Sequence, residues 1–564
     1  MKIRINNYFR LVPGCLGALF VTMAMGQQPD TIFYNGKILT ADAEFSIVEA
    51  VSMSEGRFTV VGKSSDLLNQ AGPNTEKVDL KGKTVIPGLI DNHMHYMRGA
   101  SRWRFEARID GVTSRAEALN IIGDKAKEAG PGKWVFVLGG WSEQQFADKA
   151  GGFTKEELDG VAPQNPVFLQ KSYSRAYMNT LAEQAIGSSS SGSGRMTGGR
   201  SSGGGSNQSQ GNRSKGNSGN SKGGGSKGSS GARTTINKAL TFIPERSEAD
   251  RVDDIVYFNS YLNRLGLTTV YDVGRGSDGN FDPVKSLADS EKLTMRVYHT
   301  LRYRAYNPQE VDRAIQLIDS SKPLECDDWF GLIGLGEHIY SPLHDSTMRS
   351  SFFDRGIWGQ FERLITAAAS GGWHIHEHAQ RDTTAEGIID IAERLNSKYP
   401  MKDLRWSVAH CALMSEGSID RAKQLGLTLA VHNKTAKPVV EGQDSPPVGH
   451  MQKSGIIWGL GSDGTVVSTI NPFHTLWWVT SGKVFPNQVS IKNPVSRKDA
   501  LIAHTRSNAY MMFKEKDLGT IEAGKLADMV VLDRDYLTIP VDEIRDIKAL
   551  MTVVGGKTVY SAVR

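Results

Sequence analysis

Short apolar runs that end in glycine or a polar residue recur along the chain and alternate with segments of helical periodicity. Such runs are typical of buried parallel strands, and segments such as 361–370 and 384–396 have the spacing of amphipathic helices. Eight runs predict strands, at 84–95, 267–274, 293–301, 330–338, 372–380, 404–412, 427–434 and 456–464. The pattern therefore predicts an α/β fold, a TIM-like (β/α)8 barrel.

Both ends of the chain show a different pattern, in which hairpin-like runs turn at glycines. These runs lie at 31–40, 48–62, 77–86, 519–533 and 546–561. A small β-sandwich domain formed by both termini, from residues 27–86 and 517–564, accounts for their similarity. The barrel then occupies residues 87–516.

The segment between the first two predicted strands, 97–266, is too long for a simple crossover and is predicted to be an insertion. It contains strand-like runs of its own at 133–141 and 165–173. Within it, residues 187–233 are mostly Gly, Ser and Asn with scattered bases, and cannot bury enough apolar surface to offset the entropy of ordering. We expect this Gly/Ser-rich segment to be a disordered surface loop; an active-site flap or a tether to an anionic surface is the alternative.

Residues 1–26 have the organisation of a secretory signal peptide. A basic start precedes an apolar stretch, 11–25, and a small-x-small cleavage site. The stretch is too short and too broken for a good membrane span, and a lipoprotein signal at Cys15 is disfavoured because little apolar sequence precedes it. We therefore expect a mature protein with no stable membrane span, periplasmic or secreted, in which Cys326 and Cys411 could pair.

The formal charge of +5 on 564 residues is unevenly distributed. Seven bases and no acid lie in 187–233, and three bases and no acid lie in 1–26, so the rest of the chain carries a charge of −5. This mildly acidic body gives no sign of nucleic-acid binding. A small-molecule substrate is the expected partner, and the sequence leaves open whether the chain forms a homo-oligomer.

Histidines and acids stand at the predicted strand ends, where the chemistry of such a barrel is located. His93 and His95 lie two residues apart, so a strand would point both imidazoles the same way. Imidazole and carboxylate are ligands for zinc and related divalent metals, and six of them at strand ends are hard to explain by packing. The predicted metal site contains His93, His95, Glu337, His378, His410 and Asp463.

The segments around these residues resemble the amidohydrolase superfamily, and within it the family 3 group that includes N-substituted formamide deformylases. The carriers of the resemblance are "VIPGLIDNHMH", "GLGEHIY", "HEHAQRD", "SVAHC", "GLGSDG" and "GTIEAGKLADMVVLD". The resemblance covers nearly the whole mature chain. It implies His93 and His95 as ligands of one metal ion, His378 and His410 as ligands of a second, and Asp463 as a ligand and the general base. Zinc is the expected metal, with one or two ions per chain.

Many relatives carry a carboxylated lysine that bridges two metals at the position of Glu337. A glutamate can bridge in the same way, and some branches of the superfamily use one. The alternative is that Glu337 is a buried acid paired with a base such as Arg405.

The resemblance and the predicted site favour an exported metal-dependent hydrolase that cleaves a carbon–nitrogen bond in a non-peptide amide or a formamide. One alternative is a lactone or phosphoester hydrolase, which needs the same metals. The other is a non-catalytic regulatory or binding barrel, which the retention of Asp463 and the four histidines disfavours.

Other residues near the predicted site have two interpretations each. Trp141 and Tyr173 are either walls of a substrate pocket formed by the insertion or ordinary hydrophobic packing. His432 either contacts substrate or lies in a solvated loop.

Three more histidines lie close to the predicted ligands in sequence. His374 and His376 share strand parity with His378 but lie deeper, so we expect both to be interior hydrogen-bonded residues. His338 is expected to face the surrounding helices.

Overall fold

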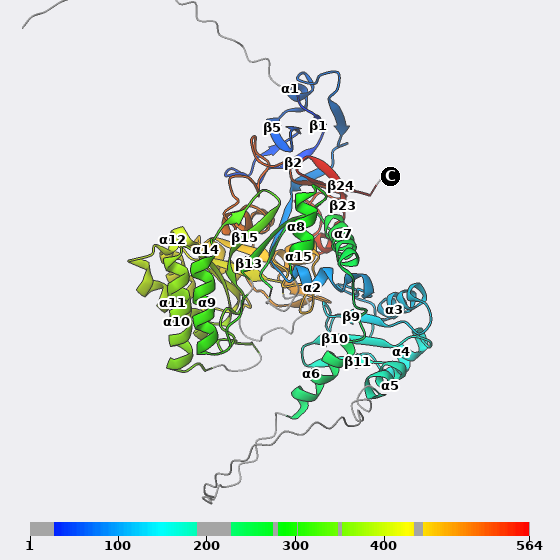
Figure 1. Cartoon of the computed structure of the whole chain (residues 1–564). Helices are drawn as coiled ribbons and strands as arrows, with labels where there is room; N and C mark the ends of the chain where they lie inside the picture. Colours follow the sequence, from blue (N-terminus) through cyan, green and yellow to red (C-terminus); the bar gives the residue numbers. More distant parts are fainter. Residues whose placement is uncertain are drawn as a thin grey trace, which may run out of the picture.

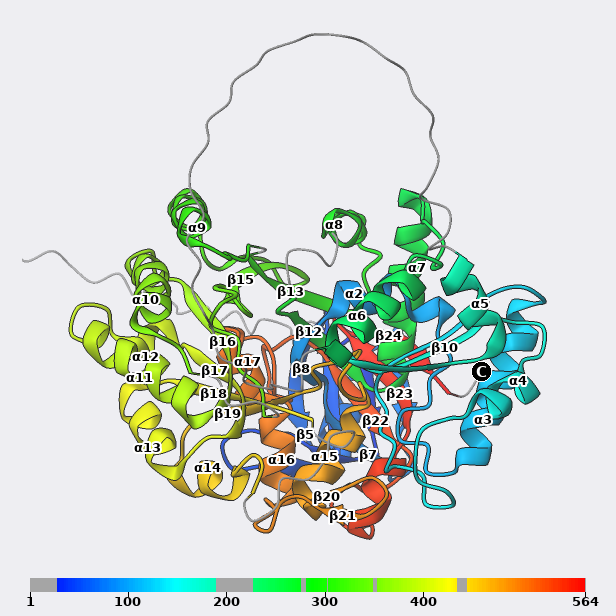
Figure 2. The same ribbon diagram turned by 90° about the horizontal axis from the view of Figure 1, so that it is seen from below.

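The computed structural model describes residues 28–188, 227–274, 280–301, 303–347, 352–433 and 444–562. The predicted signal peptide and most of the Gly/Ser-rich segment lie outside these ranges. The chain forms a barrel, with sheets from the two termini at one end and the insertion, drawn in cyan, to one side (Figures 1 and 2).

Eight parallel strands form the barrel, and each overlaps one of the eight predicted runs, with β16 and β17 ending one residue beyond theirs, so the predicted fold is confirmed. The strands are β8 (Leu89–Met94), β12 (Leu267–Asp272), β13 (Arg296–Leu301), β15 (Phe330–Gly336), β16 (His374–Arg381), β17 (Ser407–Leu413), β18 (Thr428–His432) and β19 (Trp458–Gly461). They pair in chain order, and a parallel bridge between Met94 and Gly464 brings the last strand end to the first. All the carboxyl ends therefore meet at one rim of the barrel.

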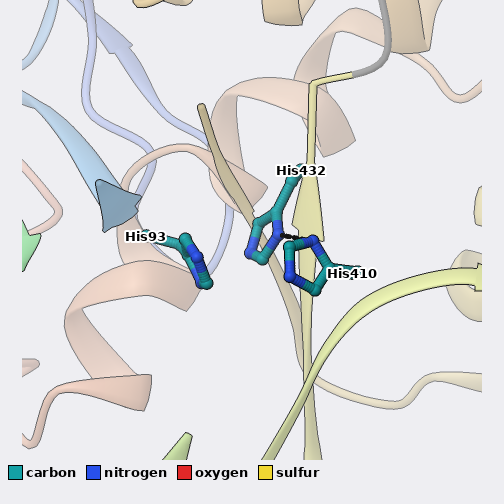
Figure 3. A group of neighbouring side chains, drawn as sticks. All are labelled: His93, His410 and His432. Carbon is teal, nitrogen blue, oxygen red and sulfur yellow. Dashed lines mark hydrogen bonds between the residues drawn. The ribbon is translucent and has the colours of Figure 1, made fainter. Parts of the chain in front are cut away.

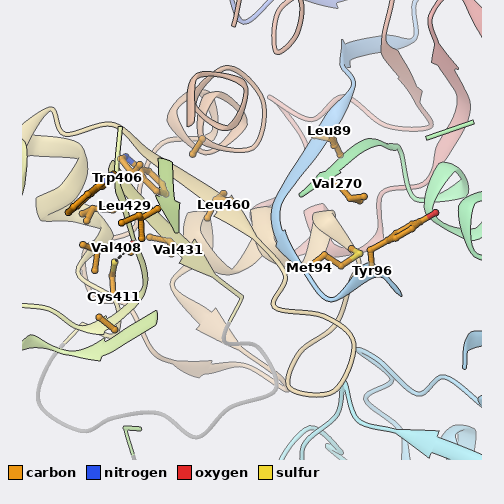
Figure 4. Packing of buried hydrophobic residues seen from close by; sticks show 14 of the residues in the cluster. Leu89, Met94, Tyr96, Val270, Trp406, Val408, Cys411, Leu429, Val431 and Leu460 are labelled. Carbon is orange, nitrogen blue, oxygen red and sulfur yellow. Dashed lines mark hydrogen bonds between the residues drawn. The ribbon is translucent and has the colours of Figure 1, made fainter. Parts of the chain in front are cut away.

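Amphipathic helices cover the outside of the strands. They include α9 (Pro308–Ser320), α10 (Arg355–Ser370), α11 (Asp382–Asn396) and α13 (Glu416–Leu425). Asp354 and Ser415 cap α10 and α13 by accepting a backbone N–H in the first turn, an interaction that stabilises a helix by about 1 kcal/mol. Figure 4 shows part of the core between the layers, with Val408 on β17, Leu429 and Val431 on β18, and Trp406 just before β17.

Both termini contribute to the sheets at one end of the barrel. A six-stranded sheet has the order β24-β23-β22-β7-β2-β3, in which β7 (Thr84–Pro87) pairs with β2 (Lys37–Leu39) and with β22 (Met529–Leu532). Its other strands are β3 (Ile47–Val48), β23 (Ala549–Val554) and β24 (Lys557–Ser561). A four-stranded sheet of order β5-β4-β1-β6 comes from the N-terminal part alone, with strands β1 (Thr31–Tyr34), β4 (Ala50–Ser54), β5 (Arg57–Gly62) and β6 (Glu76–Asp79). Phe33, Val51 and Met529 lie in the core shared by these sheets, which form the predicted β-sandwich.

Gly88 separates the terminal sheet from the barrel. The predicted run 84–95 is in fact two strands, β7 and β8, that meet at this glycine. A Cβ atom on Gly88 would lie 2.3 Å from Oγ1 of Thr268, so only glycine lets the chain pass so close to β12.

The insertion folds around its own three-stranded sheet, of order β11-β10-β9, in which β10 is Val167–Ser172 and β11 is Arg175–Met178. Residues of β9 (Val135–Leu138) alternate between two small cores, one with α3 (Arg115–Ala129) and α4 (Lys155–Val161), the other with α5 (Thr180–Ser188) and α6 (Lys227–Leu240). Helix α6 begins inside the Gly/Ser-rich segment, so the predicted disorder of residues 227–233 is wrong. Ile236 and Ala239 pack on the sheet, and the helix continues from them toward the N-terminus.

Two further expectations concern cysteines and membranes. Cys326 and Cys411 are both free thiols, so the suggested pairing does not occur. Within the described ranges, no helix combines the length and the apolar character needed to cross a bilayer.

Candidate metal centre

Two groups of donor side chains meet at the carboxyl ends of the barrel strands. The first consists of His93 and His95 at the end of β8 and Asp463 just after β19. Oδ1 of Asp463 lies 3.5 Å from Nε2 of His95 and 3.8 Å from Nε2 of His93. The backbone N–H of Asp463 donates to the carbonyl of His93 at 2.8 Å, which joins the two strand ends.

The second group consists of Glu337 just after β15, His378 on β16 and His410 on β17. Oε2 of Glu337 lies 3.3 Å from Nδ1 of His378 and 3.2 Å from Nε2 of His410. Its other oxygen, Oε1, lies 3.4 Å from Nε2 of His95. Glu337 therefore links the two groups, and the structure brings all six predicted residues together in a buried centre.

The donor set fits a divalent metal ion. With ligand bonds of about 2.0–2.2 Å in tetrahedral geometry, neighbouring donor atoms lie about 3.4 Å apart. The separations within and between the two groups range from 3.2 to 3.8 Å. Nε2 of His93 is buried and has no hydrogen-bond partner among the described residues. A metal ion bound between these atoms would satisfy this nitrogen.

The electrostatics of the centre favour positive charge. Burial by itself would raise the pKa of Glu337, but His338, His93 and hydrogen bonds from two further histidines hold it well below its ordinary value. Burial opposes protonation of His95, yet hydrogen bonds to two carboxylates raise its pKa to about 10. Burial lowers the pKa of His93 to about 4, so this imidazole is neutral, as a metal ligand must be.

The backbone at the rim is strained in a way that aims the donors inward. The φ angle is 72° at His410 and 56° at Asp463, in the left-handed region that costs a non-glycine residue about 1–3 kcal/mol. Such conformations persist where the surroundings fix them. Asp91 contributes to this, because its Oδ1 accepts the backbone N–H groups of His93 at 3.1 Å and Ser462 at 2.9 Å.

His432 is buried at the end of β18, so its interpretation as a solvated loop residue is wrong. Its Nδ1 lies 2.7 Å from Nδ1 of His410, and its ring centroid lies 3.8 Å from that of His93. Figure 3 shows the three rings directed toward one another from different strands.

His374 and His376 are interior hydrogen-bonded residues, as expected. Nε2 of His376 lies 2.9 Å from Nδ1 of His93, and Nδ1 of His374 lies 3.3 Å from the carbonyl oxygen of Leu404. His338, by contrast, does not face the helices. The chain leaves the strand at Gly336, and the left-handed conformation of His338, with φ 58°, turns its ring to within 4.2 Å of the His378 ring.

The alternative partner for Glu337 is also wrong. Arg405 forms a 2.8 Å ion pair with Glu515 and lies over the ring of Tyr510. Glu337 is surrounded by histidines instead, which is consistent with a ligand rather than with one half of an ion pair.

The predicted substrate-pocket residues of the insertion have different surroundings. Trp141 is buried against Phe146 and Phe153, and its Nε1–H donates to the carbonyl of Gln170 at 3.1 Å, so the packing interpretation describes it. Tyr173 is partly exposed, and its hydroxyl accepts a 3.0 Å hydrogen bond from Arg98 on α2 (Tyr96–Ala100). Tyr173 therefore connects the insertion to the helix that follows His95.

Asp91 and Asp345 are site residues that the sequence analysis missed. Asp91 shares the two-residue alternation of His93 and His95, which could have identified it. Asp345 lies in the loop after β15, is fully buried, and has Oδ1 2.9 Å from Nε2 of His378. No periodic pattern in that loop marks it.

A cavity of about 380 Å³ borders α2, and none of the six predicted metal-site residues lines it. Met97 and Arg98 line this cavity, and in the chain they follow directly after His95 and Tyr96. Apolar side chains and arginines alternate around it, among them Leu240, Ile243, Arg102, Arg246 and Arg251.

A barrel with a buried histidine–carboxylate centre at its carboxyl rim defines a class of metal-dependent hydrolases. The sequence model described as "Amidohydrolase family" matches residues 76–560, so this chain belongs to the amidohydrolase family. The resemblance found in the sequence is thereby confirmed, and the chain is a metal-dependent hydrolase.

Relatives of the chain match it over nearly its full length. "Protein LONG AFTER FAR-RED 3" of Arabidopsis thaliana is 26% identical, over 96% of this chain and 93% of its own. "N-substituted formamide deformylase" of Arthrobacter pascens is 24% identical, over 95% and 99%. The solved structure of an uncharacterized metal-dependent hydrolase from Pyrococcus furiosus has a TM-score of 0.58 at 18% identity, over 90% of this chain and 100% of its own, and shares the fold.

Proposed function

We propose that this chain is an exported hydrolase that cleaves a carbon–nitrogen bond in a non-peptide amide or a formamide. The observation that carries the proposal is the Asp463 carboxylate, which lies 3.5 Å from a histidine nitrogen of a metal-type donor set. The similarity to a formamide deformylase over 99% of that protein's length supports the type of bond. The composition of residues 1–26 supports export.

The six donors have two roles in this proposal. His93, His95 and Asp463 would hold one divalent ion, with zinc expected, and His378 and His410 would hold a second or complete the first. Glu337 lies between the groups, with one oxygen toward His95 and the other toward His378 and His410, so its carboxylate can bridge. A bound metal ion of this kind polarises a substrate carbonyl and lowers the pKa of water to about 7.

Asp463 is the general base. Its carboxylate takes the proton from the attacking water and returns it to the leaving nitrogen, which an amide needs because a bare nitrogen anion leaves poorly. The left-handed backbone of Asp463 and its hydrogen bond to the carbonyl of His93 hold the carboxylate in position. Its Oδ2 lies 3.7 Å from Nδ1 of His410, inside the same centre.

The cavity beside α2 is the candidate substrate pocket. Its volume falls within the range of about 300–1,000 Å³ typical of small-molecule sites. Met97 and Arg98 connect its wall to His95 in the chain, and its mixture of apolar and arginine side chains suits an organic substituent that carries a polar or acidic end.

The test combines elemental analysis with a substrate panel. The purified mature chain, supplemented with zinc or manganese, should carry at least one metal ion and should hydrolyse formamides or N-acyl amines faster than lactones or phosphoesters. Asp463→Asn should fold normally and lose about 100-fold or more in turnover, the scale of a lost general base. Asp289→Asn, at an exposed helical acid, is the matched control.

Three results would contradict the proposal. A chain without metal after supplementation cannot work as described. Turnover only of lactones or phosphoesters would support the alternative hydrolases. Near-native turnover in a metal-loaded Asp463→Asn variant would remove Asp463 from the reaction.

A further inference from the structure

We propose that His376, His432 and Asp345 form an outer ring that fixes the tautomers of three metal-binding histidines. Each accepts a hydrogen bond from the ring nitrogen that faces away from the metal. The inference rests on the proposed metal site. It adds three positioning residues that are not among the six predicted metal ligands.

The first contact joins two buried histidines. Nδ1 of His93 lies 2.9 Å from Nε2 of His376, while Nε2 of His93 is the buried nitrogen that faces Glu337 and Asp463. If Nε2 binds a metal it carries no proton, so the ring proton is on Nδ1. His376 must then accept at Nε2, and its own proton is on Nδ1.

The second contact repeats this arrangement on the next strands. Nε2 of His410 lies 3.2 Å from Glu337, and Nδ1 of His410 lies 2.7 Å from Nδ1 of His432 (Figure 3). Nδ1 of His410 lies 3.7 Å from Oδ2 of Asp463, too far for a hydrogen bond, so the nearer Nδ1 of His432 is its acceptor. With Nε2 of His410 toward the metal, Nδ1 of His410 donates and Nδ1 of His432 accepts. The two rings stand nearly perpendicular, at 87°, with centroids 4.3 Å apart.

The third contact has a carboxylate in place of an imidazole. Nδ1 of His378 lies 3.3 Å from Glu337, and Nε2 lies 2.9 Å from Oδ1 of Asp345. Asp345 is itself held by the backbone N–H groups of Gln380 at 3.0 Å and Arg381 at 2.8 Å. The loop after β15 is therefore fixed to the end of β16, and Asp345 in it presents its carboxylate to one ligand.

The three contacts have the same chemical role, which the packing of the side chains alone would not require. A free neutral imidazole carries its proton on either nitrogen, and only one of the two forms can bind the metal. An acceptor behind the ring stabilises the binding-competent form and holds the plane of the ring, and a carboxylate acceptor also makes the ligand more basic. Asp345 should therefore contribute more to metal affinity than either histidine of the ring.

The experiment measures metal affinity and ligand-field spectra of the full-length mature chain. Asp345→Asn puts an amide NH2 where the contacts described are with the backbone N–H groups of Gln380 and Arg381 and with Nε2 of His378, and leaves the backbone carbonyl of residue 345, 3.2 Å from that nitrogen, unchanged. His376→Phe and His432→Phe keep a ring and remove the acceptor. His374→Phe is the matched control, since His374 is buried on the same strand as His376 but hydrogen-bonds the backbone of Leu404 and Arg405.

Zinc affinity, measured by competition with a chelator, should fall about 10–100-fold in the three ring variants and most in Asp345→Asn. It should stay within about twofold of wild type in His374→Phe. The visible absorption of the Co²⁺-loaded ring variants should shift, and that of the control should not.

The other possible results of this experiment also decide whether the outer ring exists. Wild-type affinity and an unchanged Co²⁺ spectrum in the ring variants would overturn the ring and leave the proposed function standing. A wild-type chain that binds no metal would overturn both. If one variant fails to fold by circular dichroism, the other two decide.

Discussion

Glu337 is the residue on which the metal centre converges. Its carboxylate oxygens lie between 3.2 and 3.7 Å from ring nitrogens of all four predicted ligand histidines. A bridging lysine would first have to react with carbon dioxide, whereas a glutamate already carries its carboxylate. The surrounding histidines hold the pKa of Glu337 low, so this carboxylate is ionised throughout the neutral range.

Metal binding to the metal-free protein should therefore proceed equally well with and without bicarbonate. Glu337→Gln keeps the size of the side chain but removes its charge, and should lower metal affinity by more than about 100-fold, the upper end of what loss of an outer partner costs. Metal content after reconstitution in degassed buffer is the measurement. Glu515→Gln, which removes an acid that pairs with Arg405 away from the centre, is the control.

Two outcomes would exclude a bridging role for Glu337. One is metal binding that depends on added bicarbonate. The other is full metal occupancy in the Glu337→Gln variant under conditions where Glu515→Gln is also fully occupied.

The sequence predicts the orientation of a side chain well when its residue lies on a regular strand. Alternation along β8 predicts that His93 and His95 point together, and the structure brings them to one centre. Prediction fails where the backbone leaves the strand. His338 follows Gly336 in a left-handed conformation, so its side chain faces the metal centre and not the helices, as had been expected. Asp345 reaches His378 from a loop whose sequence has no regular pattern of apolar and polar positions.

At the scale of elements, the insertion touches the rim of the barrel beside Asp463. Gly139, just after β9, has φ 96°, and a Cβ atom there would lie 1.9 Å from the carbonyl oxygen of Val466. The backbone N–H of Gly140 donates to that same carbonyl at 3.1 Å. The end of the insertion sheet thus fixes the segment that follows the proposed general base.

Gly139→Ala should therefore displace the segment around Val466 and lower turnover by up to about 100-fold, the cost of a misplacement of about 1 Å in a catalytic group. Gly130→Ala is the matched control, because Gly130 also has a positive φ, 82°, but nothing lies within 4 Å of an added Cβ. Both variants put a Cβ atom on a backbone with positive φ, which costs about 1–3 kcal/mol. Steady-state kinetics and thermal unfolding together separate the two effects.

Equal turnover in the two glycine variants would show that the insertion does not position the rim. Equal losses of stability combined with unequal turnover would support the argument, since only the steric contact differs between them.

A strand or helix could be predicted where the apolar and polar residues within that element alone determine its structure. Runs of eight to twelve residues rich in apolar side chains predicted all eight barrel strands, because buried parallel strands are apolar on both faces. The start of α6 was not predictable. Its helix extends into a stretch of Gly and Ser because residues further along pack on a sheet that the composition of the stretch does not reveal.

At the scale of the whole molecule, a buried ion pair joins the barrel to the terminal sheets. Arg296 on β13 and Asp528, next to β22, form two hydrogen bonds of 2.8 Å each, and the Arg296 side chain is 0% exposed. The guanidinium also lies 4.5 Å from the ring centre of Trp329. Asp528 in turn accepts the backbone N–H of Gly555, so the pair also anchors the last hairpin of the chain.

Arg296→Met should lower the free energy of unfolding by about 3–5 kcal/mol, because it leaves the Asp528 carboxylate buried without its counter-charge. Adding Asp528→Asn to that variant should recover part of the loss, since a neutral amide is less costly to bury. Arg394→Met, which breaks an exposed pair with Glu362, should cost no more than about 1 kcal/mol. Urea unfolding of the four chains, wild type included, measures these differences. If Arg296→Met were no less stable than Arg394→Met, or if Asp528→Asn made it worse, the pair would not be what holds the barrel and the terminal sheets together.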